Sequence, residues 1–389
     1  YLILIFFNFI IVQSTAQTWE EFNASNSNLP SNNVTGLSIS ENGKIWISTT
    51  YGIASFDEEI QAYKLNGTGF GDNILNIWTT PEDNIWVGTE YRGLWGFDGV
   101  NSWGHYHTNS SGNGIIGFGI DSNDTIWILD KFGDFEKWND GYWEEISDFF
   151  SQGNGLFVDS KDNIWLLSNN SGLQKYFNGQ LLIHYKNNWI DKTREDYIPS
   201  VSIHDMVEDS EGNYWIGSND GLIKFDGVLF TVYNTENSDI PSNKIRTLAI
   251  DEKNIIWIGT WDAGISKFDG TSWVNYNLTN SPLASNIIND IEIGQDGKIW
   301  IANGYNEFRS PSGGQGIFVF DEFNDNSDGI LPNAPTDLSI KVISINEVKL
   351  SWLDNSDNES GFNIERSTNN NVDFKQLKFL MEDNNTFTD

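Results

Sequence analysis

The chain has 389 residues, with 22 Lys and Arg against 55 Asp and Glu, a formal net charge of −33 at pH 7 and no cysteine. Nucleic acids and anionic membranes bind through basic surfaces, so this charge excludes both as ordinary partners. The lack of cysteine excludes disulfides, and a chain of this length can bury a core without them.

The first residues of the chain are apolar. Residues 1–12 form an uncharged run that is followed by Ser14, Thr15 and Ala16. Such a run ahead of small residues is typical of a secretory signal peptide and is too short to span a bilayer. We expect residues 1–16 to be a signal peptide remnant, and the protein to be secreted, periplasmic or at the cell surface.

A tryptophan then recurs in one short setting, as in Ile45-Trp46-Ile47 and Ile256-Trp257-Ile258. The repeated residues are Trp46, Trp86, Trp127, Trp165, Trp215, Trp257 and Trp300, which subtraction spaces by 40, 41, 38, 50, 42 and 43. A period near 40 residues is typical of a repeat architecture.

Each repeat predicts four short strands. Around Trp257 they are strand A at 245–251, strand B at 255–259, strand C at 264–268 and strand D at 273–276. The joints carry the Asp, Asn and Gly residues that tight hairpins need. Four antiparallel strands repeated radially predict β-propeller blades, with the repeated tryptophans buried between neighbouring sheets.

The two ends of the repeat predict how the ring closes. The unit at Trp300 has a strand C at 316–321 and no strand D after it, whereas residues 19–23 align with the strand D at 273–277. We therefore predict an all-β chain whose residues 17–323 form a seven-bladed β-propeller closed by an N-terminal strand. Closure removes open sheet edges.

The repeat also carries a more specific pattern. Leu-Pro-Ser-Asn at 29–32 precedes an Ile- and Val-rich strand, and the later repeats add Asp-x-x-Gly-x-x-Trp-Ile-Gly-Thr-x-x-Gly-Leu-x-x-Phe-Asp-Gly. This pattern resembles the two-component regulator propeller repeat over residues 19–323. That resemblance implies a bacterial extracytoplasmic recognition protein, since the family supplies the often glycan-responsive sensing part of hybrid sensor kinases and also occurs in exported proteins. Such sensors usually carry two propellers, a membrane span and a kinase, and this sequence departs from that arrangement.

The last part of the chain predicts a different domain. Residues 324–333 are an acidic, Asn-rich linker, and residues 334–389 resemble a fibronectin type III domain, with Trp352 expected in its core. The fibronectin-like sandwich needs about seven strands. Residues 334–389 offer fewer, so we expect an incomplete fibronectin type III-like domain.

The strand order predicts which loops share a face. The B–C and D–A loops lie with the starts of the A strands, and the tight A–B and C–D turns lie on the opposite face. Aligned on Arg246 and Thr247, the other A strands start with Thr35-Gly36, Leu75-Asn76, Ile116-Gly117, Asn154-Gly155, His204-Asp205 and Asn289-Asp290. The expected ligand-binding residues on this face are Tyr51, Tyr91, Arg92, Trp189, His204, Asp205, Arg246, Trp261, Asp262, Asn289, Asp290, Tyr305 and Arg309.

These side chains suggest the chemistry of the ligand. Aromatic rings that stack, beside Arg, Asp, Asn and His, are typical of glycan sites. The favoured function is a monomeric, non-catalytic exported protein that binds a glycan or an extracellular protein without a cofactor or metal. The alternative is a polysaccharide lyase or glycosidase with His204 or Asp205 as base and Arg246 neutralising a substrate carboxylate.

Three further patterns are weaker. His105 and His107 form a His-x-His pair, but the alignment directs both side chains to solvent, which disfavours a metal clamp. Residues 209–215 are similar to the Asp-box of sialidases, yet their place between strands A and B predicts a hairpin turn. Residues 321–329 lack the ligand order of a calcium loop.

Overall fold

The chain divides into two compact units. The larger comprises Glu21–Leu278 and Leu283–Phe318, and the smaller comprises Tyr1–Glu20, Thr279–Pro282 and Val319–Asp389. The structure is a computed structural model that describes residues 8–13, 18–63, 74–80, 83–97, 103–106, 114–139, 141–148, 152–177, 180–185, 198–200, 202–304, 314–322, 336–344, 347–353, 361–367, 375–381 and 386–388.

Six antiparallel sheets are each built from four strands that follow one another in the chain. The strands of the first three sheets are β3 (Val34–Ile39), β4 (Ile45–Thr49), β5 (Gly52–Asp57) and β6 (Glu59–Tyr63); β7 (Ile74–Thr79), β8 (Ile85–Thr89), β9 (Leu94–Phe97) and β10 (Trp103–Tyr106); β11 (Ile115–Ile120), β12 (Ile126–Asp130), β13 (Asp134–Asn139) and β14 (Tyr142–Asp148). The strands of the next three are β15 (Gly153–Val158), β16 (Ile164–Ser168), β17 (Leu173–Phe177) and β18 (Gln180–Tyr185); β19 (Ile203–Glu208), β20 (Tyr214–Ser218), β21 (Gly221–Phe225) and β22 (Phe230–Tyr233); β23 (Ile245–Ile250), β24 (Ile256–Thr260), β25 (Ile265–Phe268) and β26 (Trp273–Tyr276).

A seventh four-stranded sheet combines strands from both ends of the repeat. Its order is β2-β29-β28-β27, with β2 at Thr18–Phe22, β27 at Ile288–Ile293, β28 at Ile299–Gly304 and β29 at Gly314–Asp321. The ring of Trp19 stacks on Phe320 at 4.5 Å, and Phe22 stacks on Trp300 at 6.3 Å. No helix occurs within the residues that the structure describes.

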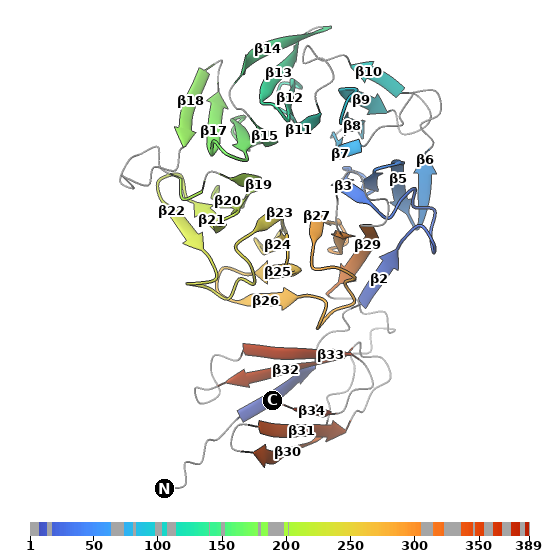
Figure 1. Ribbon diagram of the computed structural model, residues 1–389, viewed down its shortest axis with the longest axis vertical. Coiled ribbons are helices and arrows are strands. Elements are labelled where there is room, and N and C mark those ends of the chain that lie inside the picture. Colours follow the sequence, from blue (N-terminus) through green and yellow to red (C-terminus); the bar gives the residue numbers. More distant parts are fainter. Residues whose placement is uncertain are drawn as a thin grey trace. The chain divides into compact units, whose positions relative to one another are not determined.

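The A strand of each sheet, which is β27 in the seventh sheet, is the innermost one (Figure 1). Each of these A strands contacts the next, and β27 contacts β3. Hydrogen bonds also join β27 to β3, because Leu37 N–H donates to Asp290 Oδ2 at 2.8 Å and Asn289 Nδ2 donates to Val34 O at 2.9 Å. The A strands therefore form a continuous circuit of contacts.

The repeated tryptophans are structural, as the sequence predicted. All seven are at most 7% exposed. The indole N–H of Trp215 donates to Asp209 Oδ2 at 3.0 Å, and Asp209 Oδ1 accepts the backbone N–H groups of Glu211 and Asn213. One carboxylate thus closes the A–B hairpin and anchors the buried indole, which confirms the hairpin interpretation of residues 209–215.

Every A strand carries a β-bulge near its start. In each of the seven strands the register against strand B shifts across a single residue. The bulged residues are Thr35, Leu75, Ile116, Asn154, His204, Arg246 and Asn289. They are the residues that the sequence alignment placed in one row. A bulge re-aims a side chain, so this irregularity positions the site.

The smaller unit contains two three-stranded sheets. One has the order β30-β31-β34 and the other the order β1-β32-β33, with β1 at Asn8–Gln13, β30 at Thr336–Ser344, β31 at Glu347–Leu353, β32 at Gly361–Ser367, β33 at Lys375–Met381 and β34 at Thr386–Thr388. Trp352 is 5% exposed, as expected for a core residue. Strand β1 belongs to the predicted signal remnant, and that interpretation did not anticipate a strand there.

Candidate functional site

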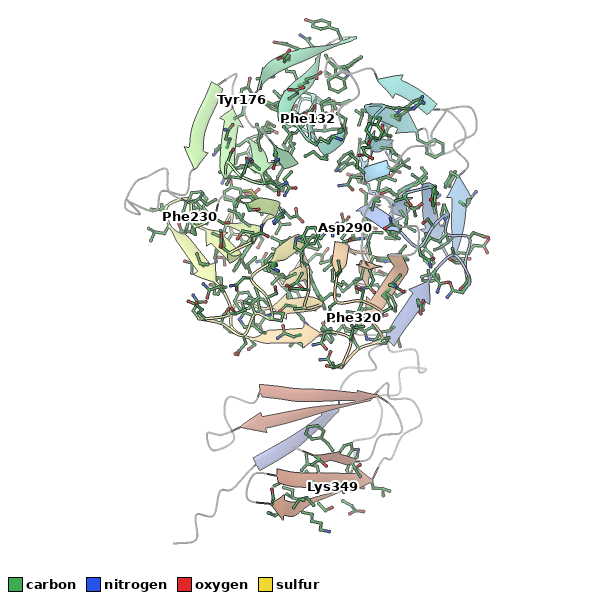
Figure 2. All side chains as sticks on the ribbon, viewed as in Figure 1. Phe132, Tyr176, Phe230, Asp290, Phe320 and Lys349 are labelled. Atoms are coloured by element: carbon green, nitrogen blue, oxygen red, sulfur yellow. The ribbon has the colours of Figure 1, made fainter. Side chains whose placement is uncertain are left out.

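The inner strands enclose a cavity of about 490 Å³. It is lined by residues along the A strands, including those at their starts, and Asp290 lies at the inner end of its sheet (Figure 2). Five of the predicted ligand-binding residues meet there: His204, Asp205, Arg246, Asn289 and Asp290. Three consecutive A strands, β19, β23 and β27, thus bring these polar side chains to one cavity, as their alignment suggested.

Two neighbours hold the imidazole of His204. Asn154 Nδ2 donates to His204 Nδ1 at 2.8 Å, and His204 Nε2 lies 3.0 Å from Asn219 Oδ1. Since Nδ1 accepts, Nε2 carries the proton and donates to Asn219. Burial lowers the pKa of His204 and the nearby charge of Arg246 lowers it further, while the bond to Asn219 opposes the shift. The ring is therefore neutral at physiological pH.

Arg246 stacks its guanidinium on Trp261. The Cζ atom lies 4.2 Å from the centre of the indole, a cation–π contact. Among the described residues no hydrogen bond or ion pair to the guanidinium is found, and Nη1 is shielded from solvent as well. Burial lowers the pKa of Arg246 to about 10, against the favourable charge of Asp290. The side chain remains a cation at neutral pH, with its donors unsatisfied.

Two carboxylates fasten neighbouring A strands to one another. Asp205 accepts the backbone N–H of Leu248 on β23 at 2.7 Å, and Asp290 accepts that of Leu37 on β3 at 2.8 Å. Burial raises the pKa of Asp205 to about 7 and that of Asp290 to about 6. Both groups therefore titrate close to physiological pH.

The Thr247 hydroxyl connects these two carboxylates. It donates to Asp290 Oδ1 at 3.0 Å, and its side chain also hydrogen-bonds Asp205. The bond to Thr247 lowers the pKa of each carboxyl, but burial has the larger effect and raises both.

Glu292 is a lining residue that the sequence reasoning missed. It lies two positions after Asp290 on β27, so alternation along the strand could have found it. Burial, followed by the charges of Asp290 and Asp205, raises the pKa of Glu292 well above its usual value. The cavity therefore favours the protonated form of Glu292 more than water does.

Asn154 and Asn289 repeat one strand-to-strand contact. Asn154 Nδ2 donates to Ile203 O at 2.7 Å, and Asn289 Nδ2 donates to Val34 O at 2.9 Å. Each amide thus binds the carbonyl of the next A strand. Oδ1 of Asn289 is shielded and finds no donor within the described part of the chain, so it is an acceptor available at the edge of the cavity.

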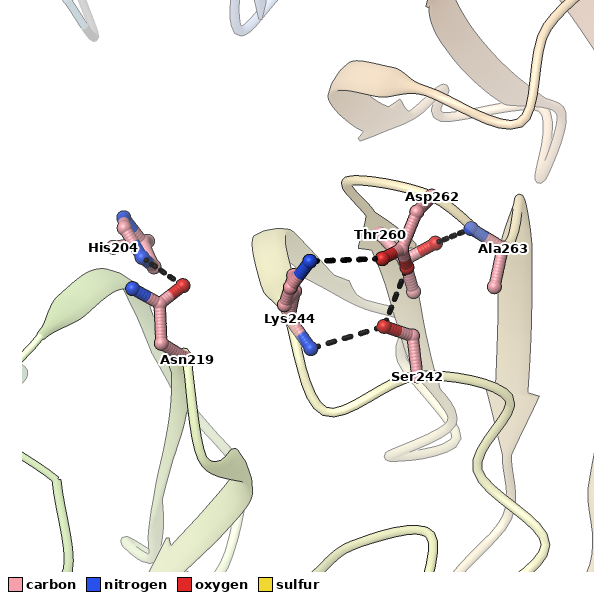
Figure 3. Close-up of polar contacts among 7 residues, drawn as sticks. All are labelled: His204, Asn219, Ser242, Lys244, Thr260, Asp262 and Ala263. Atoms are coloured by element: carbon pink, nitrogen blue, oxygen red, sulfur yellow. Dashed lines mark hydrogen bonds and ion pairs between the residues drawn. The ribbon is translucent and has the colours of Figure 1, made fainter.

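Asp262 is held by the preceding D–A loop. It accepts Ser242 Oγ at 2.6 Å and pairs with Lys244 Nζ at 3.3 Å (Figure 3). The preceding sheet repeats the contact, where Ser200 Oγ donates to Asp220 at 2.6 Å. The geometry gives Asp262 a role in joining the D–A and B–C loops.

We expect Asp262→Ala to lower the free energy of unfolding by about 1–2 kcal/mol, because one charge-assisted hydrogen bond is lost. Asp220→Ala should have an effect of similar size, since its partner and distance are the same. Urea unfolding measures both. A loss at Asp220 with none at Asp262 would show that the two contacts are not equivalent.

The exposed aromatic residues lie on other loops. Tyr51 is 66% exposed, Tyr91 57% and Phe132 52%, and Lys131 Nζ lies 5.3 Å from the ring of Tyr91 and 5.5 Å from that of Phe132. Arg92 is exposed beside them. Tyr51, Tyr91, Arg92 and Phe132 are not among the residues that line the cavity. The three aromatic residues lie on the B–C loops of three successive sheets and are named the aromatic rim.

The remaining predicted residues, Trp189, Tyr305 and Arg309, lie outside the described residues, as does His107. The described residues contain no group of three His, Cys, Asp or Glu side chains placed to hold a metal ion. They also include no helix long and apolar enough to cross a membrane.

Comparison with known families gives one match. Residues 28–51, 197–220 and 239–262 match the family described as two component regulator propeller. Each segment runs from a D–A loop through strands A and B, and two of them end at Asp220 and Asp262. No curated protein sequence matches the chain.

Solved structures resemble the chain over most of its length. A streptogramin B lyase is 18% identical with a TM-score of 0.65, covering 80% of this chain and 99% of the lyase. The fold is a β-propeller. The extracellular domain of a hybrid two-component system of B. thetaiotaomicron is 16% identical with a TM-score of 0.62. The similarity covers 94% of this chain and 50% of the extracellular domain. PorZ, a surface component of the type-IX secretion system of Porphyromonas gingivalis, is 13% identical with a TM-score of 0.59. The similarity covers 92% of this chain and 55% of PorZ. The chain thus spans about half the length of the last two proteins.

Proposed function

We propose that this chain is an exported, non-catalytic recognition protein that binds a glycan in the cavity of its inner strands. The observation that carries the proposal is Arg246, a partly buried cation stacked on Trp261 at 4.2 Å with no described hydrogen-bond partner, beside about 490 Å³ of space. A cavity of this size with a few convergent polar groups is typical of small-ligand sites. The extracellular regulator domain among the similar structures supports recognition outside the cytoplasm.

We infer that the seven four-stranded sheets are the seven blades of one propeller, at residues 17–323. The contacts of β27 with β3 and the place of β2 in the last sheet support closure by the N-terminal strand. Residues 334–389 would form a fibronectin type III-like spacer after a linker at 324–333, and residues 1–16 a signal remnant. The expected state is a monomer.

The hydrogen bonds of the cavity favour binding over catalysis. Both nitrogens of His204 are occupied by Asn154 and Asn219, so the ring is not free to remove a proton from a substrate. Asp205 and Asp290 accept backbone N–H groups that fasten neighbouring strands. These groups build the wall of the cavity.

One observation supports the alternative, a polysaccharide lyase or glycosidase. Burial raises the pKa of Asp205 to about 7, the range suited to general acid–base catalysis. An extracellular protein ligand is the other alternative, and the aromatic rim of Tyr51, Tyr91 and Phe132 supports it, because exposed aromatic residues are enriched in protein interfaces.

A glycan and polysaccharide array separates these functions. The full chain should bind at least one glycan without releasing products over hours, and Trp261→Ala should weaken binding roughly 10- to 100-fold, because the indole orients the guanidinium. Thermal unfolding should change little, since Trp261 lies on a loop. Release of products would show that the protein is an enzyme. Absence of binding to any glycan on the array would favour a protein ligand.

A further inference from the structure

We propose that the ligand of this cavity carries a carboxylate that binds Arg246, which makes acidic glycans built from uronic acids its ligand class. This inference rests on the proposed glycan-binding function and specifies it.

Arg246 is a partly buried cation whose Nη1 is shielded from solvent, and no counter-ion contacts it among the described residues. A buried charge is costly unless it is paired and hydrogen-bonded. Although Asp290 acts on Arg246 through space, no ion pair joins them, and the oxygens of Asp290 already accept from Leu37, Ile291 and Thr247. The part of the chain that the structure describes offers the guanidinium no carboxylate in contact, and a ligand carboxylate would satisfy it.

The geometry of the guanidinium selects among anions. Its planar fork of N–H donors matches a carboxylate with two parallel hydrogen bonds. Stacking on Trp261 holds that plane fixed at 4.2 Å, so less side-chain entropy is lost on binding. A single neutral hydroxyl could satisfy only part of this donor set.

A sugar hydroxyl would complete the site. Oδ1 of Asn289 is a shielded acceptor without a donor in the described part of the chain, and it lines the same cavity as Arg246. A carboxylate accepts only, and a hydroxyl donates. A sugar acid presents both groups on one ring.

The titratable groups around Arg246 make this binding depend on pH. They are His204 and Asp205 on β19 and Asp290 and Glu292 on β27. Burial lowers the pKa of His204 and raises that of Glu292, whereas Asp290 and Asp205 gain negative charge as pH rises through about 6 and about 7. A bound carboxylate is repelled by that charge, so its affinity should fall between pH 5.5 and pH 8.

The test is calorimetric titration of the full chain with tetramers of galacturonate, glucuronate, mannuronate and guluronate, and with their methyl esters. At least one tetramer should bind, with affinity roughly 10- to 100-fold above that of its ester. Arg246→Gln should remove the difference, and Arg246→Lys should restore part of it. Lys253→Gln removes the same charge on the opposite A–B turn and should leave binding unchanged.

The two proposals fail differently. If a neutral glycan binds as tightly as the uronides and Arg246→Gln weakens both equally, the acidic ligand class is overturned and recognition of glycans stands. If neither uronides nor neutral glycans bind the folded protein, both fall. An affinity for the uronide that is constant from pH 5.5 to pH 8 would also contradict the inferred surroundings of the carboxylate.

Discussion

Replacing Trp165 with alanine is expected to lower the free energy of unfolding by about 3–5 kcal/mol, because a fully buried aromatic side chain leaves a cavity. Trp165 is 1% exposed, its ring lies 5.0 Å from that of Tyr214 on the next sheet, and its N–H donates to Asp159 Oδ2 at 2.8 Å. The substitution removes packing and one partner of a carboxylate together. Urea unfolding followed by circular dichroism measures the loss.

The variant Trp165→Phe separates these two contributions. Phenylalanine keeps most of the buried area and loses only the indole donor, so we expect a loss of about 1–2 kcal/mol. Losses below 1 kcal/mol for both variants would contradict the assignment of the repeated tryptophans to the core between sheets.

The second large effect is on the pH dependence of stability at Asp290. Burial raises the pKa of Asp290 to about 6, above the usual value near 4 in the unfolded chain. Between these values the folded protein holds a proton that the unfolded chain releases, so the free energy of unfolding falls as pH rises through this window. About two pKa units correspond to roughly 3 kcal/mol.

Asp290→Asn removes that titration. The variant loses hydrogen bonds at every pH, but its deficit relative to the wild type should shrink by about 3 kcal/mol between pH 4 and pH 7 and then stay constant. Asp226→Asn is the control, since backbone N–H groups of Leu229 and Val228 lower the pKa of Asp226, and its deficit should not shrink with rising pH. A deficit at Asp290 that is independent of pH would show that the carboxyl is not buried as described.

The sequence repeat predicted the strands and the aligned residues at the starts of the A strands. The Ile-Trp-Ile setting marks strand B, and alignment on Arg246 and Thr247 identifies the residues that the bulges re-aim. The regularity is physical, because each unit must bury its tryptophan against the next sheet. The alignment could not reveal that β1 forms a strand, since apolar residues suit both a signal segment and a sheet.

Individual roles within the site depended on contacts that sequence cannot supply. Asp262 was placed correctly on its loop, but its bonds to Ser242 and Lys244 come from a loop 20 residues earlier. His204 is neutral because burial and the charge of Arg246 lower its pKa. Glu292 belongs to no sequence motif, and only its burial beside Asp290 and Asp205 marks it as a candidate site residue.

The central claim is that recognition occurs where the A strands start. Hydrogen–deuterium exchange of the full chain, with and without the tightest-binding glycan of the array, tests it most directly. We expect protection of the starts of β19, β23 and β27, around His204, Arg246 and Asn289, with the A–B turns at 209–213 and 251–254 unchanged. Protection confined to those turns would place the ligand on the opposite face and contradict the account.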